Sequence, residues 1–306
     1  MILRAVLAAT LLASPVMAGD IAFVTSQNAD SVSIVDLATG ALRVTVPVPG
    51  APAPVAYDAD ASLAYVVSAK TGALTVLDPQ GAVQGRAELG EGAFGIAAAG
   101  GRLFVTDWYG GRLRALTADG TELWASSTGA APAGVALSED GRIVASCDRD
   151  ADQVSAFDTA TGQPLWQART GSHPYAIAFH DGRFWTTDVQ SNSVTVIGAD
   201  GAARGRVEVG DHPYGIAFAG GRGFVTDQYA STVTVFDPAN LRVTGTISVD
   251  DYPEGIAALS DGRHVALTNW DSNTLMVIDA ETLAVTQTIE VPDGPRSFGV
   301  FVGPDR

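Results

Sequence analysis

A phrase of about 40 residues recurs seven times between residue 21 and the C-terminus. Each copy contains an apolar residue that opens a short run resembling Gly-Ile-Ala, and consecutive copies of this residue lie 39 to 42 positions apart. These landmark residues are Val55, Ile96, Val135, Ile177, Ile216, Ile256 and Phe298. A regular period with four short apolar runs per copy is typical of propeller blades. We therefore predict an all-β fold: a seven-bladed β-propeller with four antiparallel strands per blade.

One copy shows the four expected strands, which we call A to D in chain order. They cover residues 175–179, 184–187, 193–197 and 203–209. Asp-Gly or Gly-Gly pairs stand between strands A and B of four copies, at 140–141, 181–182, 220–221 and 261–262. Tight hairpins need residues that tolerate a positive φ, so these pairs predict short A-to-B turns.

The two ends of the chain predict how the ring closes. Residues 21–25, 31–35 and 41–48 correspond to strands B, C and D, and no strand A precedes them. The missing strand is expected at 297–302, near the C-terminus. We predict a closing blade made of one C-terminal and three N-terminal strands, which leaves no open sheet edge at the seam.

The first 18 residues are typical of a secretory signal peptide. Arg4 precedes the apolar run 5–12, and the small-residue site Val16-Met17-Ala18 follows. This run is too short to cross a bilayer, and no later stretch contains 18 unbroken apolar residues. We predict an exported protein, periplasmic in a Gram-negative cell, in which residues 19–306 form a single propeller domain without membrane insertion.

Charge and cysteine content exclude several function classes. The formal net charge of −16 disfavours nucleic acid and anionic membranes as partners, and it permits cations or a basic protein. The single cysteine, Cys147, follows a Val-Ala-Ser run and is expected to be a small buried residue. Because the chain has no Cys-x-x-Cys-His motif, covalently attached haem is excluded.

The repeat resembles the YVTN-type 40-residue propeller family, which includes periplasmic YncE-like propellers, over essentially the whole mature chain. The matching phrases are Phe-Val-Thr-Asp at 224–227, Val-Thr-Val-Phe-Asp at 233–237 and Val-Gly-Asp-His-Pro-Tyr-Gly-Ile-Ala at 209–217. The family Asn is replaced by Asp at 107, 148, 188 and 227 and by Ser at 26 and 68, and is kept at Asn269. The resemblance implies a propeller fold, but such propellers include binding platforms, redox-enzyme subunits and enzymes.

A second resemblance covers two copies only. Residues 156–166, ending in Trp166, are similar to the tryptophan docking phrase of pyrroloquinoline-quinone dehydrogenases, and residues 115–124 are a shortened copy. This implies that each tryptophan packs against the next blade. The sequence leaves the cofactor unknown: a quinone and a metal are both candidates, and no motif specifies either.

Loops that join D to A and B to C emerge on one face of a propeller, around the mouth of its central channel. Aromatic, acidic and imidazole side chains gather in these loops, so we predict a ligand-binding site on this face, which we call the mouth face. The candidate residues are His173, Tyr175, His212, Tyr214, Tyr252, Glu254, Arg296, Asp107, Trp108, Asp188, Asp227 and Trp270.

Several of these residues also have a structural interpretation. An Asp after a strand accepts hydrogen bonds from its own turn, and a Pro stiffens a turn. The two histidines contribute nothing to a turn. His173 and His212 with Asp188 and Asp227 are therefore candidate ligands for a divalent transition metal, although residues on separate blades have no spacing that identifies a metal site.

Two functions remain open. The first is a non-catalytic binding platform that takes a protein partner or a small molecule on the mouth face, as an accessory to a redox or catabolic system. The second is an enzyme or enzyme subunit, either similar to the propeller subunits of amine dehydrogenases or a lyase or lactonase. In the second case Glu254, His173 and His212 would supply acid and base, and Arg296 would bind an anion. No nucleophile or phosphate-loop motif is present, which favours the platform.

Overall fold

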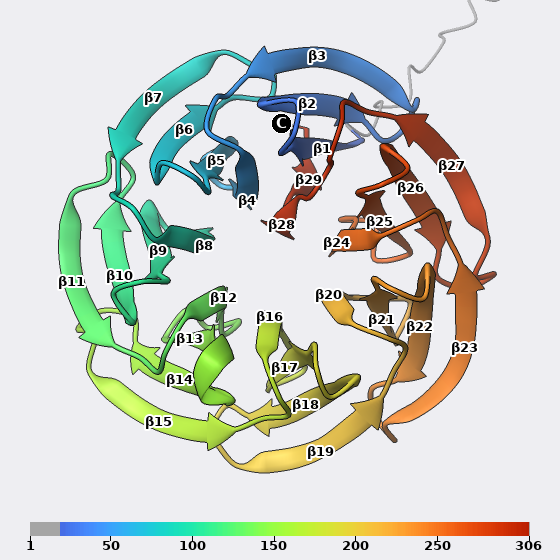
Figure 1. Cartoon of the computed structure of the whole chain (residues 1–306). Helices are drawn as coiled ribbons and strands as arrows, with labels where there is room; N and C mark the ends of the chain where they lie inside the picture. The colour runs from blue at the N-terminus through green and yellow to red at the C-terminus, as the bar shows by residue number, and fades with distance from the viewer. Residues whose placement is uncertain (1–18, 306) are drawn as a thin grey trace, which may run out of the picture.

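The computed structural model describes residues 19–305 and confirms the all-β prediction. Seven sheets stand around a central axis, with strand A of each innermost and strand D outermost (Figure 1). The segment 1–18, which we interpret as a signal peptide, lies outside the described residues.

The blades are numbered from the N-terminus. Blade 1 combines β1 (Asp20–Ser26), β2 (Ser31–Asp36) and β3 (Ala41–Pro47) with β29 (Val302–Pro304). Blade 2 contains β4 (Pro52–Asp58), β5 (Leu63–Ser68), β6 (Ala73–Leu77) and β7 (Val83–Glu88). Blade 3 contains β8 (Ala93–Ala99), β9 (Arg102–Asp107), β10 (Arg112–Thr117) and β11 (Glu122–Ser127). Blade 4 contains β12 (Pro132–Leu137), β13 (Ile143–Asp148), β14 (Gln153–Asp158) and β15 (Pro164–Arg169), with the 3-10 turn η1 (Arg149–Ala151) after β13.

The remaining blades repeat this pattern. Blade 5 contains β16 (Pro174–His180), β17 (Arg183–Asp188), β18 (Ser193–Gly198) and β19 (Ala203–Glu208). Blade 6 contains β20 (Pro213–Ala219), β21 (Arg222–Asp227), β22 (Thr232–Asp237) and β23 (Arg242–Ser248). Blade 7 contains β24 (Pro253–Ala258), β25 (His264–Asn269), β26 (Thr274–Asp279) and β27 (Val285–Glu290). The strand β28 (Phe298–Val300) lies beside β4 near the axis (Figure 1).

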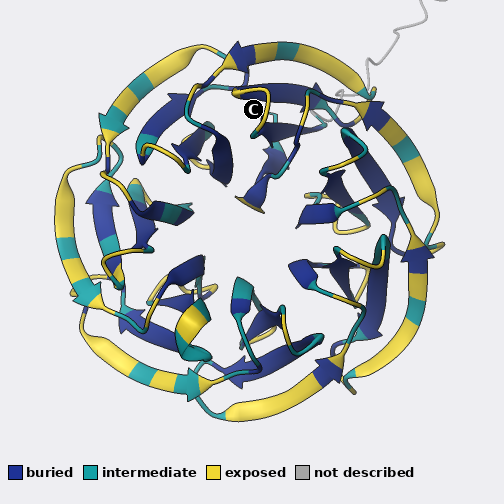
Figure 2. Cartoon of the chain, viewed as in Figure 1, coloured by how far each residue is buried: buried dark blue, intermediate teal, exposed yellow. Residues whose placement is uncertain are grey.

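The degree of burial depends on the position of the strand within its blade. Strands B and C are almost entirely buried, because both of their faces pack against neighbouring blades, whereas the outer strands β3, β7 and β11 alternate or are exposed (Figure 2). The valine, isoleucine and phenylalanine side chains of the inner strands form clusters that cross blade boundaries. A single blade could not bury these faces alone, so packing between blades supplies the hydrophobic stabilisation.

Two of the four predicted A-to-B turns, in blades 4 and 7, are longer connections at residues 138–142 and 259–263, in which Gly141 and Gly262 have φ values of 67° and 65°. The other two are tight hairpins, as predicted. Asp181 and Gly182 have φ values of 49° and 72°, and Gly220 and Gly221 have values of 56° and 72°. Such values are those of the tight turns that suit the twist of two antiparallel strands.

The tryptophan docking that the second resemblance implied is also confirmed. The indole nitrogen of Trp124 in blade 3 donates to the carbonyl of Thr159 in blade 4 at 3.1 Å. Trp166 in blade 4 does the same to Ala199 in blade 5 at 2.9 Å. Each outer strand is thereby attached to the following blade.

A second contact between blades recurs near the axis. The threonine that precedes the last residue of strand B donates its hydroxyl to a carbonyl of strand A in the next blade. Examples are Thr106 to Ala133 (2.8 Å) and Thr226 to Glu254 (2.7 Å). Blade 4 has Cys147 at this position, fully buried, and its thiol lies 3.4 Å from the carbonyl oxygen of Ala176. Burial raises the pKa of this thiol well above its ordinary value, which agrees with a structural role.

Adjacent A strands approach so closely that most of them need glycine at one position. A Cβ added to Gly95 would lie 2.1 Å from the carbonyl oxygen of Ala133, and one added to Gly255 would lie 2.2 Å from that of Ser297. The glycine of the repeated Gly-Ile-Ala run is therefore explained by the backbone of the neighbouring blade.

The ring closes as predicted, with one difference in detail. β29 pairs with β1 in antiparallel register, so a C-terminal strand completes blade 1. The expected strand 297–302 is interrupted, however, and β28 pairs in parallel with β4 of blade 2 instead. Ser297 and Gly299 have φ values of 47° and 117°, which turn this segment away from β1 toward the axis. The backbone returns to β1 where Phe23 donates to the carbonyl of Phe301 at 2.8 Å.

Deleting the last ten residues should abolish cooperative unfolding. The deletion removes both β28 and β29, exposes the edge of β1 and uncovers core residues of blades 1 and 2, so a loss of tertiary structure is expected rather than a small shift. Thermal unfolding followed by circular dichroism checks this, with a chain lacking only the final residue as the control. A truncated chain that melts cooperatively near the full-length temperature would contradict this account of closure.

Candidate functional site at the channel mouth

The start of each strand A places one side chain at the mouth of the channel. In blade 6, for example, Pro213 lies opposite Asp227, and Tyr214 follows at the bulge before Ile216. The same register recurs in the other blades and defines a ring of seven positions, which we call the inner ring. Its members, from blade 2 round to blade 1, are Ala53, Phe94, Ala133, Tyr175, Tyr214, Glu254 and Arg296.

Three inner-ring aromatics meet on the axis around Phe298. The ring centroid of Phe298 lies 4.9 Å from that of Tyr175, 5.4 Å from Phe94 and 5.7 Å from Tyr214. These rings come from blades 3, 5 and 6 and from β28, so their contact fills the centre of the channel. We call this group the aromatic plug. The sequence indicated Tyr175 and Tyr214 as site residues, and it identified Phe298 only as a repeat landmark.

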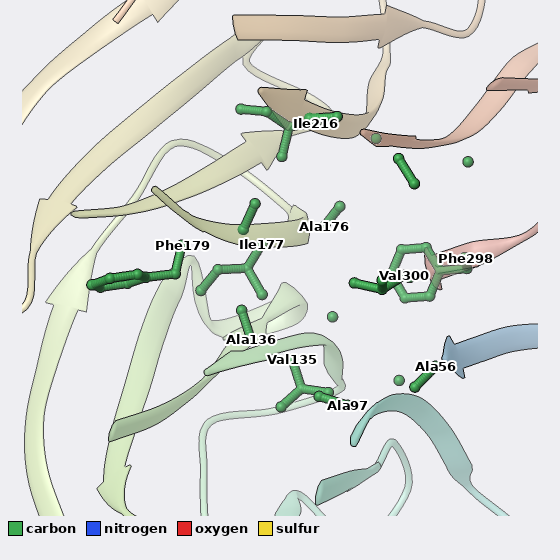
Figure 3. Close-up of a pocket in the computed structure, with 18 of the residues that line it drawn as sticks. Ala56, Ala97, Val135, Ala136, Ala176, Ile177, Phe179, Ile216, Phe298 and Val300 are labelled. Carbon is green, nitrogen blue, oxygen red and sulfur yellow. The ribbon is translucent and has the colours of Figure 1, made fainter. Parts of the chain in front are cut away.

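A cavity of about 480 Å³ occupies the channel on the other side of the plug (Figure 3). It is lined by residues that follow the inner-ring positions along the A strands, and Ala136, Ile177, Ile216 and Phe298 surround it in Figure 3. All A strands run from the mouth face toward the A-to-B turns, so this cavity lies on the turn side of the plug. The predicted mouth site and the channel cavity are therefore separate places.

An ion pair stands beside the plug. Arg296 contacts both carboxylate oxygens of Glu254, from Nε at 2.7 Å and from Nη2 at 3.1 Å. Gln228 donates to Glu254 at 2.7 Å, and Arg296 donates to Gln27 at 3.0 Å. Glu254 is only 1% exposed, and its burial raises the pKa of the carboxyl group while the guanidinium of Arg296 opposes the shift.

The hydroxyl group of Tyr214 belongs to the same cluster. The Cζ atom of Arg296 lies 5.6 Å from the Tyr214 ring centroid, and the ring of Tyr175 lies 5.0 Å away. Burial raises the pKa of Tyr214 well above its ordinary value. The structure thus brings together Tyr175, Tyr214, Glu254 and Arg296, four of the predicted site residues.

A second group of aromatic residues lies further out on the mouth face, over blades 6 and 7. His212 stacks on Tyr229 at 3.7 Å, Tyr229 lies 5.5 Å from Tyr252, and Tyr252 lies 6.1 Å from Trp270. We call these four residues the aromatic arc. Tyr229 is 52% exposed, and the sequence-based prediction did not include it among the site residues.

Trp108 occupies a similar place on the opposite side of the mouth. Its ring lies 5.4 Å from Phe94 in an edge-on arrangement, and the guanidinium carbon of Arg149 lies 5.7 Å from the Trp108 ring centroid. Tyr109, the next residue, is 80% exposed.

The aspartates at the ends of the B strands bond within their own blades. Asp227 accepts from the Gly210 amide at 3.0 Å and from the hydroxyls of Thr232 at 2.9 Å and Thr234 at 2.7 Å. Asp188 is held in the same way by Thr195, at 2.6 Å. Burial raises the pKa of both carboxyl groups.

Asp107 differs in its partner. It accepts from the Gly110 amide at 2.7 Å and forms an ion pair with Arg112 at 2.6 Å. All three carboxylates therefore face turn and strand groups of their own blades.

The two predicted histidines occupy a strained backbone position. His173 and His212 have φ values of 57° and 54°, and Tyr252 in the following blade has 60°. Their carbonyl groups accept hydrogen bonds from backbone amides of the B-to-C loops; the Gln228 amide, for example, donates to the His212 carbonyl at 3.0 Å. Each imidazole contacts its immediate neighbour, His173 with Ser172 and His212 with Asp211, both at 3.0 Å.

Residues 19–305 contain no group of three or more His, Cys, Asp or Glu side chains arranged to hold a metal ion. The structure thus does not bring our candidate metal ligands together as such a group: His173, His212, Asp188 and Asp227.

No helix within residues 19–305 is long and apolar enough to cross a membrane.

Replacing Asp227 with asparagine should leave the protein as stable at pH 7 as the unchanged chain, or more stable. Blade 7 already has Asn269 at this position, where it donates to Thr274 at 3.0 Å. Burial raises the pKa of Asp227 in the folded chain, so the protonated carboxyl group is the form that favours folding. This stabilisation is fully present below about pH 3.9 and is lost as the pH rises through the pKa of the folded state. The advantage of asparagine should therefore grow from pH 4 to pH 7 in urea unfolding experiments.

Asp227→Ala is the matched comparison. It leaves the hydroxyls of Thr232 and Thr234 without their acceptor and removes one of the two acceptors of the Gly210 amide, so it should reduce the free energy of unfolding by about 1–3 kcal/mol. If the asparagine and alanine variants lost the same stability, the hydrogen-bond role of Asp227 would be wrong.

Comparison with known proteins supports the fold and leaves the function open. Residues 70–182, about a third of the chain, match the family model of the outer membrane protein assembly factor BamB. This range includes Trp124 and Trp166, and the matched family differs from the YVTN-type family that the repeat resembles. No curated protein matches the sequence.

Solved structures of low sequence identity share the architecture. A functionally unknown protein from Desulfotomaculum acetoxidans superposes with a TM-score of 0.76 at 15% identity, covering 93% of this chain and 99% of its own. Hydrazine synthase from Kuenenia stuttgartiensis gives 0.73 at 17%, covering 89% and 99%. A streptogramin B lyase gives 0.68 at 16%, covering 79% and 84%. The chain is thus similar to an assembly factor and to structures of enzymes, and what it shares with the solved structures is the β-propeller fold.

Proposed function

We propose that the protein is an exported, non-catalytic interaction platform whose mouth face binds a basic segment of a partner protein. The observation that carries this proposal is the aromatic arc. Its four rings touch in sequence over two neighbouring blades, and exposed carboxylates stand beside them at Asp211, Asp251 and Asp271.

The chemistry of this surface suits lysine and arginine side chains. Tyrosine and tryptophan are enriched at the centres of protein interfaces, and their ring faces attract cations. Carboxylates at the border add attraction and increase the rate of association. The formal net charge of −16 acts in the same direction over longer distances.

The proposed setting is the periplasm. The residues 1–18 have the order of a signal peptide, and an accessory role in a redox or catabolic system agrees with this location. Similarity of residues 70–182 to an assembly factor of the outer membrane supports a role within a larger assembly.

Binding to a basic probe tests the platform. A fluorescent 12-residue peptide of alternating lysine and alanine should bind, and its affinity should fall steeply between 50 and 200 mM salt because screening weakens exposed charge interactions. Tyr229→Ala should weaken binding about tenfold or more, as expected for an exposed interface aromatic. Tyr109→Ala is the matched control, since Tyr109 is exposed in the equivalent loop of blade 3.

Charge variants complete this test. Changing Asp211, Asp251 and Asp271 to asparagine should reduce both affinity and salt dependence in fluorescence anisotropy. The same loss of charge on the opposite face, at Glu139, Asp181 and Glu281, should have a much smaller effect. Equal effects from the two sets would mean that the peptide responds only to total charge, and the arc would not be the binding surface.

A catalytic function at the mouth is the second candidate, and the Glu254 cluster favours it. A buried carboxyl group with a raised pKa, beside an arginine and two phenols, has the composition of an acid–base site. The similarity to a streptogramin B lyase structure agrees with this candidate. Replacing Glu254 with glutamine distinguishes the two functions once a ligand is found: an enzyme loses turnover and keeps binding, whereas a platform that uses the aromatic arc keeps binding the basic peptide.

A further inference from the structure

The hydroxyl group of Tyr214 is the least expected feature of the mouth. The residue is 5% exposed, and within residues 19–305 its hydroxyl makes no hydrogen bond of good geometry, although the Tyr175 hydroxyl and the Glu254 carboxylate lie near enough to influence its pKa. Buried polar groups are nearly always paired, and an unpaired one lowers stability. A hydroxyl kept unpaired beside an ion pair therefore points to a ligand that completes it.

Arg296 provides further donors at the same place. Its guanidinium has five N–H groups. Three of them donate hydrogen bonds, two to Glu254 and one to Gln27. Nη1 and Nη2 each retain one N–H beyond these contacts. With the Tyr214 hydroxyl these N–H groups form a set of donors next to the plug, so the ligand must carry a hydrogen-bond acceptor.

The charges around this set are already balanced. Glu254 accepts from both Arg296 and Gln228, and its charge is matched by the guanidinium. Two further arginines of the mouth face are also paired, Arg149 with Asp150 and Arg112 with Asp107, both at 2.6 Å. A ligand carboxylate would be buried without a positive charge to balance it. A neutral carbonyl oxygen needs no balancing charge, so this site suits a neutral ligand better.

The surroundings of these donors are aromatic. A chain of ring contacts runs from Trp108 through Phe94 and Tyr175 to Tyr214, with successive centroids 5.4, 6.1 and 5.0 Å apart. All but Tyr214 are partly exposed on the mouth face. The inner ring has small, buried alanines at Ala53 and Ala133, so its large side chains are concentrated at the other five positions. A flat apolar body suits such a lining.

We propose that the mouth of the channel is a binding site for a neutral aromatic carbonyl compound, whose oxygen accepts hydrogen bonds from the Tyr214 hydroxyl and Arg296. This site uses residues other than the aromatic arc, so it is independent of the basic partner proposed above. Glu254 holds Arg296 in place and is a positioning residue.

Three naphthalene derivatives that differ in one group test the ligand class. 1-Naphthamide has a neutral carbonyl, 1-naphthoate a carboxylate and 1-methylnaphthalene no acceptor. Naphthyl fluorescence should show that 1-naphthamide binds most tightly. Tyr214→Phe removes only the unpaired hydroxyl and should weaken 1-naphthamide about three- to tenfold, the worth of one hydrogen bond, without changing the affinity for 1-methylnaphthalene.

Stability measurements keep this test independent of folding. Tyr214→Phe should melt at or above the temperature of the unchanged chain, because it removes a buried unpaired group. Tyr109→Phe is the matched control and should alter neither binding nor melting. The double change Glu254→Gln with Arg296→Gln removes both charges together and should abolish the preference for 1-naphthamide.

Three outcomes would overturn the proposal. Tighter binding of 1-naphthoate would mean an anion site. Equal affinity for all three compounds would mean apolar adsorption without carbonyl recognition. Unchanged 1-naphthamide affinity in Tyr214→Phe would show that the hydroxyl does not touch the ligand.

Discussion

Packing of each blade against its neighbours is the interaction on which the rest of this structure depends. The inner strands are buried on both faces, and no blade can cover those faces alone. Continuity around the ring is therefore required, and a short C-terminal segment provides it by pairing with β1 and β4. Because the last strand covers the edge of the first, stability at the seam depends on residues about 280 positions apart, such as Ala22 and Val302.

Polar contacts between blades are added to this apolar packing, and they explain much of the repeated phrase. The hydroxyl of the strand-B threonine donates to the next blade, and the acid that follows it accepts from the D-to-A loop and from strand C. The strand-A glycine leaves room for the carbonyl of the neighbouring blade. Residues that depart from the repeated phrase still make polar contacts at these positions. Cys147 retains a weak donor in the threonine position, and Asn269 is a neutral replacement for aspartate. Residues that look like a site in sequence are thus often parts of the ring itself.

The mouth face departs from this repetition. Where the packing leaves the inner-ring side chain free to vary, the chain has small, aromatic, acidic and basic residues in turn, and Phe298 joins three of them on the axis. The result is two surfaces of different chemistry: a polar cluster beside the aromatic plug and, further out, an aromatic arc with acidic neighbours. The first suits a small acceptor-bearing molecule, and the second suits a basic protein segment.

The sequence alone determined the number of blades, the strand order, the A-to-B turns and the closing of the ring, because these follow from a local period and from turn chemistry. It also placed Tyr175, Tyr214, Glu254 and Arg296 on one face, since loop positions repeat with the blades. Only the tertiary structure decided that Phe298 fills the axis, that Tyr229 joins the arc, that β28 pairs with β4, and that Asp188 and Asp227 bond to strand-C hydroxyls of their own blades. Those features depend on distances across the ring and on side-chain direction, and residues on separate blades have no fixed spacing along the chain from which either could be read.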